Sequence, residues 1–270
     1  MDDMYNKLGW AYEQKGNLAL AEANYRKALE IEPDYEIARH NLGNVLLKQG
    51  KLDEAVVCFN ELLRQKKDSV GVHYRLAVVL CIQGKYDDAI KHFARVLELN
   101  PKYPNAHKRM GEVLAAAGRM DEAVAHLNAA LQTSTNQSEV YAKLGAAYMQ
   151  LSKYELAIQN LTKAIELKPD GVEALNNMAW LLATVGDVSI QDANRAIEFA
   201  ERACELTGYK NPESLDTLAA AYAAAGRFND AVTTAQQAVD AAKAGGQEDL
   251  SGEIQDRIKL YQVGQPYRQK

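Results

Sequence analysis

The sequence has 270 residues, of which 36 are acidic, 31 are basic and 47% are hydrophobic, and its net charge is −5. That hydrophobic content supports a packed core and excludes an intrinsically disordered chain. The mild acidity argues against non-specific nucleic-acid binding by the chain as a whole. No apolar run approaches the roughly 20 residues of a membrane span, and the first residues lack the pattern of a signal peptide. We therefore expect no nucleic-acid partner and no direct membrane contact.

Small residues recur along the chain at a fixed interval. One series is Gly16, Gly50, Gly84 and Gly118, and a parallel series is Ala21, Ala55, Ala89 and Ala123. A fixed period of roughly 20 to 50 residues is typical of repeat architectures, in which each unit packs on its neighbours. The period predicts seven repeats, with ranges 2–35, 36–69, 70–103, 104–137, 138–171, 172–211 and 212–245.

The first repeat shows what each unit contains. Its two apolar stripes are Leu8, Gly9 and Tyr12 on a first helix, then Ala21, Tyr25 and Ala28 on a second. Gly16 stands where the first helix must stop, a position suited to a left-handed C-terminal cap, and Pro33 ends the second helix. Each unit is therefore predicted to be a helical hairpin that buries its apolar face only by stacking on the next unit.

This pattern resembles the tetratricopeptide repeat (TPR), in its period of about 34 residues, its Leu8-Gly9 to Tyr12 stretch, its Ala21/Tyr25/Ala28 stripe and Pro33. The resemblance covers residues 2–245. It implies an all-α, right-handed superhelical solenoid with a concave groove lined mainly by the first helices. Members of the family serve mostly in protein–protein recognition and are not catalytic. The last two repeats look more loosely like the closing segment of bacterial TPR proteins.

The two ends of the chain and the sixth repeat depart from the pattern. Repeat 172–211 is longer than the others, and its extra residues near 187–191 are expected to protrude as a loop. Residues 246–270 are predicted to form a capping helix followed by a tail that is frayed from Pro266 onward. No equivalent cap precedes the first repeat. We expect either a preceding segment in a longer chain or a first helix whose exposed face permits self-association.

The sequence contains no catalytic or cofactor motif, so we expect a protein that is not an enzyme and that has no metal site or cofactor. His73 and His107 are one repeat period apart, as are His92 and His126. That spacing places them at equivalent positions of adjacent repeats rather than around one ion. The three cysteines, Cys58, Cys81 and Cys204, are predicted to be buried or half-buried thiols on helices.

One position of the first helix is mostly basic or amide in this acidic protein. Along the seven repeats it is occupied by Lys7, Asn41, Arg75, Arg109, Lys143, Asn177 and Thr217. In the TPR family this position commonly faces the groove, where amides bind a peptide backbone and cations bind carboxylates. Alternatively, Lys7 and Lys143 simply pair with acids four residues earlier on the helix surface. Arg75 and Arg109 lack such an acid and are the stronger candidates.

Two family site types are matched only in part. Asn41 and Asn177 fit the asparagine ladder of the O-GlcNAc transferase class, but the other repeats do not. Asn44 and Arg109 lie at plausible places for the carboxylate clamp of chaperone-binding members, but not in the repeat order that the clamp requires.

Further groove candidates are Trp10 and Trp180, which share one position five periods apart. Tryptophan is a frequent interface anchor, but each ring equally suits packing on a neighbouring first helix. An apolar strip of Val78, Cys81 and Ile82 with Leu47 favours core between repeats, and the alternative is a groove surface that accepts apolar side chains of a peptide. Charge is expected to change along the groove, from a basic middle (Arg75, Lys108, Arg109, Lys143) to an acidic end (Glu173, Glu213, Asp216).

The sequence favours a non-catalytic scaffold that binds a peptide or protein segment, including one with acidic groups, in the concave groove. Two alternatives stay open. One is the substrate-recruiting region of a larger, glycosyltransferase-like and membrane-anchored enzyme; the other is a self-assembling scaffold. The compartment is cytoplasmic by default, and extracytoplasmic if a membrane segment precedes these residues in a longer chain.

Overall fold

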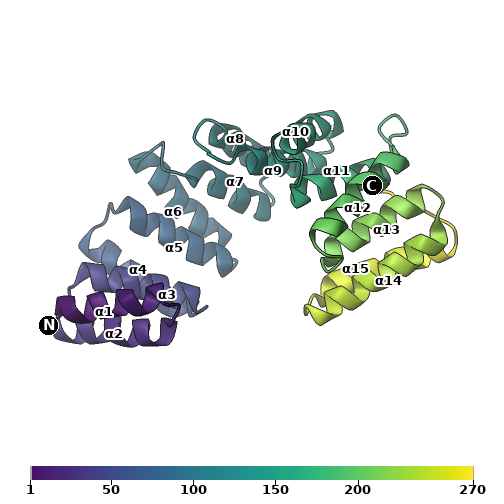
Figure 1. Ribbon diagram of the computed structural model, residues 1–270. Helices are drawn as coiled ribbons and strands as arrows, with labels where there is room; N and C mark the ends of the chain where they lie inside the picture. Colours follow the sequence, from purple (N-terminus) through teal and green to yellow (C-terminus); the bar gives the residue numbers. More distant parts are fainter. Residues whose placement is uncertain (1, 270) are drawn as a thin grey trace. The chain divides into compact units, whose positions relative to one another are not determined.

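The computed structural model describes residues 2–269, and within them it has fifteen α-helices and no strand (Figure 1). The all-α fold class is therefore confirmed. The chain divides into two compact parts, Met1–Ser134 and Thr135–Lys270, which we call the N-terminal and C-terminal blocks. Each block is described by itself.

The N-terminal block contains eight helices that form four consecutive hairpins. They are α1 (Asp2–Gln14), α2 (Leu18–Ile31), α3 (Glu36–Lys48), α4 (Leu52–Gln65), α5 (Val70–Ile82), α6 (Tyr86–Leu99), α7 (Ala106–Ala116) and α8 (Met120–Ala130). Each helix packs on the next one along the chain, so the core runs continuously from hairpin to hairpin.

The C-terminal block contains three hairpins and a fifteenth helix that packs on the last of them. Its helices are α9 (Gln137–Gln150), α10 (Tyr154–Leu167), α11 (Val172–Thr184), α12 (Ala193–Leu206), α13 (Pro212–Ala224), α14 (Phe228–Ala244) and α15 (Glu248–Gln262). The inner side of α15 buries Ile254, Ile258 and Tyr261, which cover the apolar face of α14.

Glycine closes the first helix of most hairpins, because the backbone there turns into the left-handed region. Gly84, for example, has φ 73°, and its N–H bonds the Cys81 carbonyl at 3.0 Å while the Lys85 N–H bonds the Leu80 carbonyl at 2.9 Å. These bonds satisfy carbonyls that the helix end leaves free. Ser152 serves the same purpose after α9 with φ 54°, although it is not a glycine.

A second set of glycines lets the two helices of a hairpin approach closely. A Cβ added at Gly9 would lie 2.7 Å from the Tyr25 ring, and one added at Gly145 would lie 2.5 Å from the Leu161 Cγ. Both large partners are fully buried. The periodic alternation of small and large residues is therefore a packing code within each hairpin.

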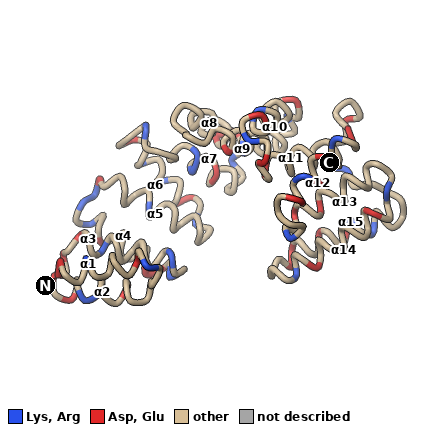
Figure 2. Tube along the Cα trace, viewed as in Figure 1, with Lys and Arg blue, Asp and Glu red and all other residues tan. Residues whose placement is uncertain are grey.

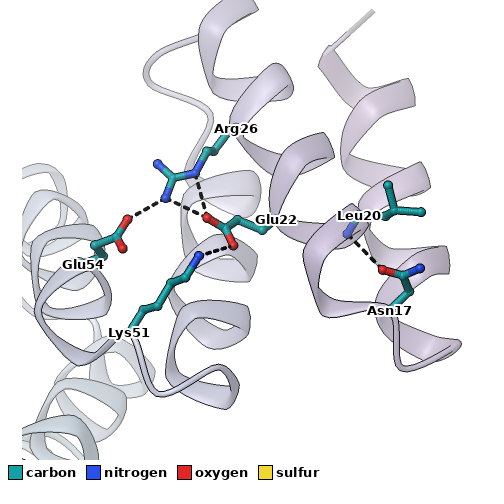
Figure 3. Close-up of polar contacts among 6 residues, drawn as sticks. All are labelled: Asn17, Leu20, Glu22, Arg26, Lys51 and Glu54. Carbon is teal, nitrogen blue, oxygen red and sulfur yellow. Dashed lines mark hydrogen bonds and ion pairs between the residues drawn. The ribbon is translucent and has the colours of Figure 1, made fainter.

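Ion pairs connect the second helices of the first two hairpins, as Figure 3 shows. Arg26 Nη2 lies 2.9 Å from Glu22 Oε1 on α2 and 2.6 Å from Glu54 Oε2 on α4. The Lys51 Nζ atom, just before α4, lies 2.8 Å from Glu22 Oε2. The Asn17 side chain caps α2 by accepting the Leu20 N–H at 3.1 Å. Exposed pairs of this kind contribute little energy each, and here they orient neighbouring helices.

The prediction that the chain frays from Pro266 onward is wrong for the described residues. Residues 265–269 fold back from the end of α15 onto α11, where Tyr267 contacts Trp180 and Arg268 donates to the Ala183 carbonyl. The tail is held because α11 ends with carbonyl groups that its own loop leaves free. Lys270, also predicted to be frayed, lies outside the described residues.

Candidate functional site

In the N-terminal block, the predicted basic and amide row takes one residue from each first helix: Lys7, Asn41, Arg75 and Arg109. Lys7 is exposed and its Nζ lies 2.7 Å from Asp3 Oδ2. This ion pair raises the pKa of Lys7 and lowers the pKa of Asp3. The ion pair that the helix-surface alternative predicts is therefore present at Lys7.

Asn41 is joined to the preceding repeat by its side chain. Its Nδ2 donates to Asn6 Oδ1 at 3.1 Å, and Asn6 Nδ2 donates to the Tyr35 hydroxyl at 3.5 Å. Asn6 is buried, and sequence reasoning missed it even though it stands next to Lys7 in the row. The two amides connect α1 to α3, so part of the hydrogen-bonding capacity of Asn41 is used within the protein.

Asn44 lies one turn further along α3. Its Nδ2 is 3.2 Å from His40 Nδ1, while its buried Oδ1 has no hydrogen-bond partner in residues 2–269. Burial lowers the pKa of His40, and the charge of Arg75 lowers it further. The Asn44 side chain is therefore turned into the protein, and its unsatisfied oxygen is closed to solvent.

Arg75 is exposed on α5 and forms no ion pair or hydrogen bond with any part of the chain that the structure describes. Helix periodicity places it on the same face of α5 as Val78 and Ile82, at i+3 and i+7. The other cations of the row, Lys7, Arg109 and Lys143, are all ion-paired. Arg75 thus differs from them in having its whole guanidinium available.

Arg109 stands beside a cavity of about 300 Å³ between α5, α6 and α7. Its Nη1 lies 2.9 Å from Glu112 Oε2. The cavity is lined by Val78, Cys81, Ile82, Tyr86, Phe93, Arg109, Glu112, Val113 and Ala116. Its walls are mainly apolar and its rim is charged, which suits one apolar side chain of a bound segment.

The interpretation of the apolar strip as core between repeats is right only in part: Leu47, Val78 and Cys81 pack against the core of the N-terminal block, but Ile82 does not. Ile82 is 59% exposed, and Val78, Cys81 and Leu47 are half-buried. The reason is that α7 packs on α8 and α6 and hardly contacts α5, which leaves the facing side of α5 partly uncovered. Burial raises the pKa of the Cys81 thiol to about 11, so the cavity contains an uncharged thiol at neutral pH.

The predicted site residues of the C-terminal block are more engaged with the protein itself. Lys143 Nζ on α9 lies 3.6 Å from Glu173 Oε1 on α11, and Asn177 is half-buried. Trp180 is half-buried under Tyr267 and Arg257, and the ring centroids of Trp180 and Tyr267 are 5.7 Å apart. In contrast, Trp10 in the N-terminal block is 57% exposed. The same position of the repeat therefore presents an open indole in one block and a covered one in the other.

The C-terminal block is more acidic than the N-terminal block, but the residues that were predicted to form a charge gradient along the groove are mostly paired or buried. Residues 1–134 carry 18 acidic and 18 basic side chains, and residues 135–270 carry 18 acidic and 13 basic ones. Figure 2 shows both signs interspersed along the helices of each block. Of the predicted acidic end, Glu173 is paired with Lys143 and Asp216 is buried against Arg257, while Glu213 is exposed. Lys108, predicted for the basic middle, is buried.

No cluster of three or more histidine, cysteine or acidic side chains in residues 2–269 could hold a metal ion. None of the helices in the described part of the chain is long and apolar enough to cross a membrane. Cys58 and Cys204 are buried and Cys81 is half-buried, all three as free thiols, which confirms their predicted placement.

Five tetratricopeptide repeat family profiles match the chain, at residues 9–50, 40–104, 80–147, 138–170 and 212–237. Protein SULFUR DEFICIENCY-INDUCED 2 of Arabidopsis thaliana is 49% identical over 65 residues, which are 24% of this chain and 21% of that protein. Protein POLLENLESS 3-LIKE 2 of the same plant is 45% identical over 67 residues, 25% of this chain and 14% of that one. The chain thus spans about a fifth or less of these curated relatives.

Solved structures extend the comparison to the whole fold. A tetratricopeptide repeat protein from Parabacteroides merdae has a TM-score of 0.71 at 16% identity, covering 97% of this chain and 98% of that one. YrrB, described as a TPR protein with an unusual peptide-binding site, has a TM-score of 0.57 at 28% identity, covering 63% and 88%. The family profiles, the helical hairpins and the closing glycines lead to one assignment: the chain belongs to the tetratricopeptide repeat family.

Proposed function

We propose that this chain is a non-catalytic interaction scaffold that binds a protein segment on the first-helix face of its N-terminal block. The observation that carries the proposal is the exposed, unpaired guanidinium of Arg75 on the same face of α5 as the apolar cavity. A side chain that is charged, ordered on a helix and without an internal partner is suited to an external anion. The likeness to YrrB, whose description names a peptide-binding site, supports a peptide as the class of ligand.

The geometry of α5 suggests the sequence of the ligand. Arg75 and Ile82 are seven residues apart on one helix, or about 10 Å at 1.5 Å per residue. An extended peptide covers that distance in about three residues. We therefore expect an acidic residue or a C-terminal carboxylate at Arg75 and an aliphatic or aromatic residue three positions away in the cavity.

An array of immobilised decapeptides tests this proposal. One set has Asp or Glu three positions from Leu or Phe, and a matched set has the same composition with the two residues adjacent. Wild-type chain should bind the first set, and the variants Arg75→Glu and Ile82→Ser should lose that binding. Equal binding of the two sets, or retention by both variants, would overturn the assigned surface.

A second candidate function, self-assembly, is favoured by one observation. Met4 and Leu8 are 56% and 41% exposed, and they lie one turn apart on α1. A second copy could bury this stripe. Light scattering over a range of concentrations distinguishes the two functions. Association of wild type that Leu8→Glu abolishes would support self-assembly, while a monomer at every concentration would rule it out and leave the first proposal untouched.

A further inference from the structure

The tail of the chain makes specific contacts on the C-terminal block. The Gln269 N–H donates to the Thr184 carbonyl at 2.8 Å. Arg268 donates from Nη1 to the Ala183 carbonyl at 2.5 Å and from Nη2 to Gln191 Oε1 at 3.4 Å. The Tyr267 ring lies against Trp180, so the segment combines one aromatic contact with hydrogen bonds at the end of α11.

The hydrogen-bonding half of this site arises from the insertion in the sixth repeat. Other first helices end in a residue with positive φ that returns N–H groups to the last carbonyls, but the backbone at Val185 and Gly186 is not left-handed. Asp192, at the far end of the loop, bonds the Leu182 carbonyl at 3.2 Å. The carbonyls of Ala183 and Thr184 remain for another donor. Because a helix C-terminus carries partial negative charge, a guanidinium is a favourable one.

A buried ion pair holds a guanidinium against the two aromatic rings of the site. Arg257 on α15 donates from Nε to Asp216 Oδ1 at 3.0 Å, and its Nη2 lies 2.8 Å from Asp216 Oδ2. This bidentate pair holds the guanidinium 5.5 Å from the Trp180 ring and 5.6 Å from the Tyr267 ring. A cation held against aromatic faces makes a slot for one further aromatic side chain.

We propose that this surface, formed by Trp180, Arg257 and the free carbonyls of α11, is a peptide-binding site whose resident ligand is the chain's own tail. Its ligand is an extended segment with an aromatic residue followed directly by arginine. This goes beyond the function proposed for the N-terminal block and uses none of its residues.

Two features make the tail displaceable. It has no helix or strand of its own, and Gly264, with φ 73°, provides a turn before it. Trp10 occupies the same position of the first repeat, and its indole is 57% exposed, so this position of the fold does not require a cover. The tail therefore acts as a built-in competitor. A partner with the same aromatic–arginine chemistry gains access by replacing it.

The test uses the full chain with Trp10→Phe, so that Trp180 is the single tryptophan. A synthetic peptide with the sequence of residues 264–270 is titrated while Trp180 fluorescence is recorded. In the Tyr267→Ala/Arg268→Ala double variant the site is vacated, and the peptide should bind saturably. The chain with the unchanged tail should bind the peptide at least tenfold more weakly, because the tethered tail competes at an effective concentration of about millimolar.

Val263→Ala serves as the control, since that exposed side chain precedes the tail and should leave the weak binding unchanged. Acrylamide quenching of Trp180 provides a second measurement without peptide, and it should rise in the double variant. Equal peptide affinity of the two backgrounds, absence of saturable binding at millimolar peptide, or unchanged quenching would each overturn the proposal.

Discussion

The Nδ1 atoms of His73 and His92 lie 2.8 Å apart, and the contact recurs one repeat later between His107 and His126 at 3.1 Å. His73 Nε2 donates to the Lys67 carbonyl at 2.8 Å, so in the neutral ring its Nδ1 accepts a hydrogen bond from the Nδ1–H of His92. Each pair joins the first helix of a hairpin to the second. Such a hydrogen bond forms only if at least one of the two imidazoles is neutral, because one Nδ1 must donate and the other must accept.

These pairs predict that acid weakens the N-terminal block first. Burial lowers the pKa of His92, His107 and His126. A folded-state pKa below the unfolded value of about 6.5 means that the unfolded chain binds more protons. The stabilisation is therefore complete above about pH 6.5 and is lost as the pH falls through that value towards the folded pKa.

Hydrogen exchange, corrected for intrinsic rates, measures this between pH 7 and pH 5. All five histidines lie in residues 1–134, so the C-terminal block is an internal control. Protection of α5 to α8 should fall while that of α11 to α14 changes little. A His92→Gln/His126→Gln variant should flatten the difference. Equal loss in both blocks would contradict the role of the pairs.

The close approach at Gly145 predicts a large effect from one methyl group. Its added Cβ would meet Leu161 Cγ at 2.5 Å, and Leu161 is fully buried. Gly145→Ala should lower the free energy of unfolding by about 1–3 kcal/mol through overpacking. The matched control is Gly71→Ala on α5, where a Cβ meets nothing within 4 Å. It should stabilise by about 0.5 kcal/mol. Urea denaturation measures the free energy of unfolding of both variants, and equal changes in the two would refute the packing code.

The buried pair of Asp216 and Arg257 predicts that one carboxylate secures α15. Both side chains are less than a tenth exposed, and burial raises the pKa of Asp216 against the opposing effect of Arg257. Asp216→Ala leaves the buried Arg257 with only a 3.7 Å contact to the exposed Glu253 and should cost about 3–5 kcal/mol. Asp256→Ala, which breaks an exposed pair with Lys259, should cost less than about 0.5 kcal/mol. A comparable cost for the two variants in denaturation would show that burial does not matter here.

The sequence allowed the periodic part of the fold to be predicted, because a helix position fixes its neighbours at i+3, at i+4 and one repeat further on. The helical hairpins and the glycine closures follow from that regularity. It does not determine how far two first helices separate, so the exposure of Ile82 beside the cavity was not predicted. The predicted row was located correctly on the first helices, but the partners that distinguish Arg75 from Arg109 depend on side-chain conformations.

Contacts between distant segments could not be predicted from the sequence, for a different reason. The tail meets α11 only because the insertion between α11 and α12 removes a helix closure, and nothing local at Tyr267 indicates that. His73 and His92 face each other across one hairpin, so their spacing does not follow the repeat period. Asn6 precedes Lys7 in the sequence, but its role depends on its hydrogen bond to Asn41 of the next repeat, which the sequence does not predict.

Fluorescence anisotropy of one labelled array peptide, titrated with Arg75→Glu and Arg64→Glu chains, tests the central claim most directly. Arg64 is the matched control, since it is an exposed arginine on the second helix α4 and the net charge changes equally. Loss of a charge-assisted hydrogen bond predicts at least tenfold weaker binding and a reduced salt dependence for Arg75→Glu, and less than a twofold change for Arg64→Glu. Equal weakening by both variants, or by neither, would contradict a binding surface centred on Arg75.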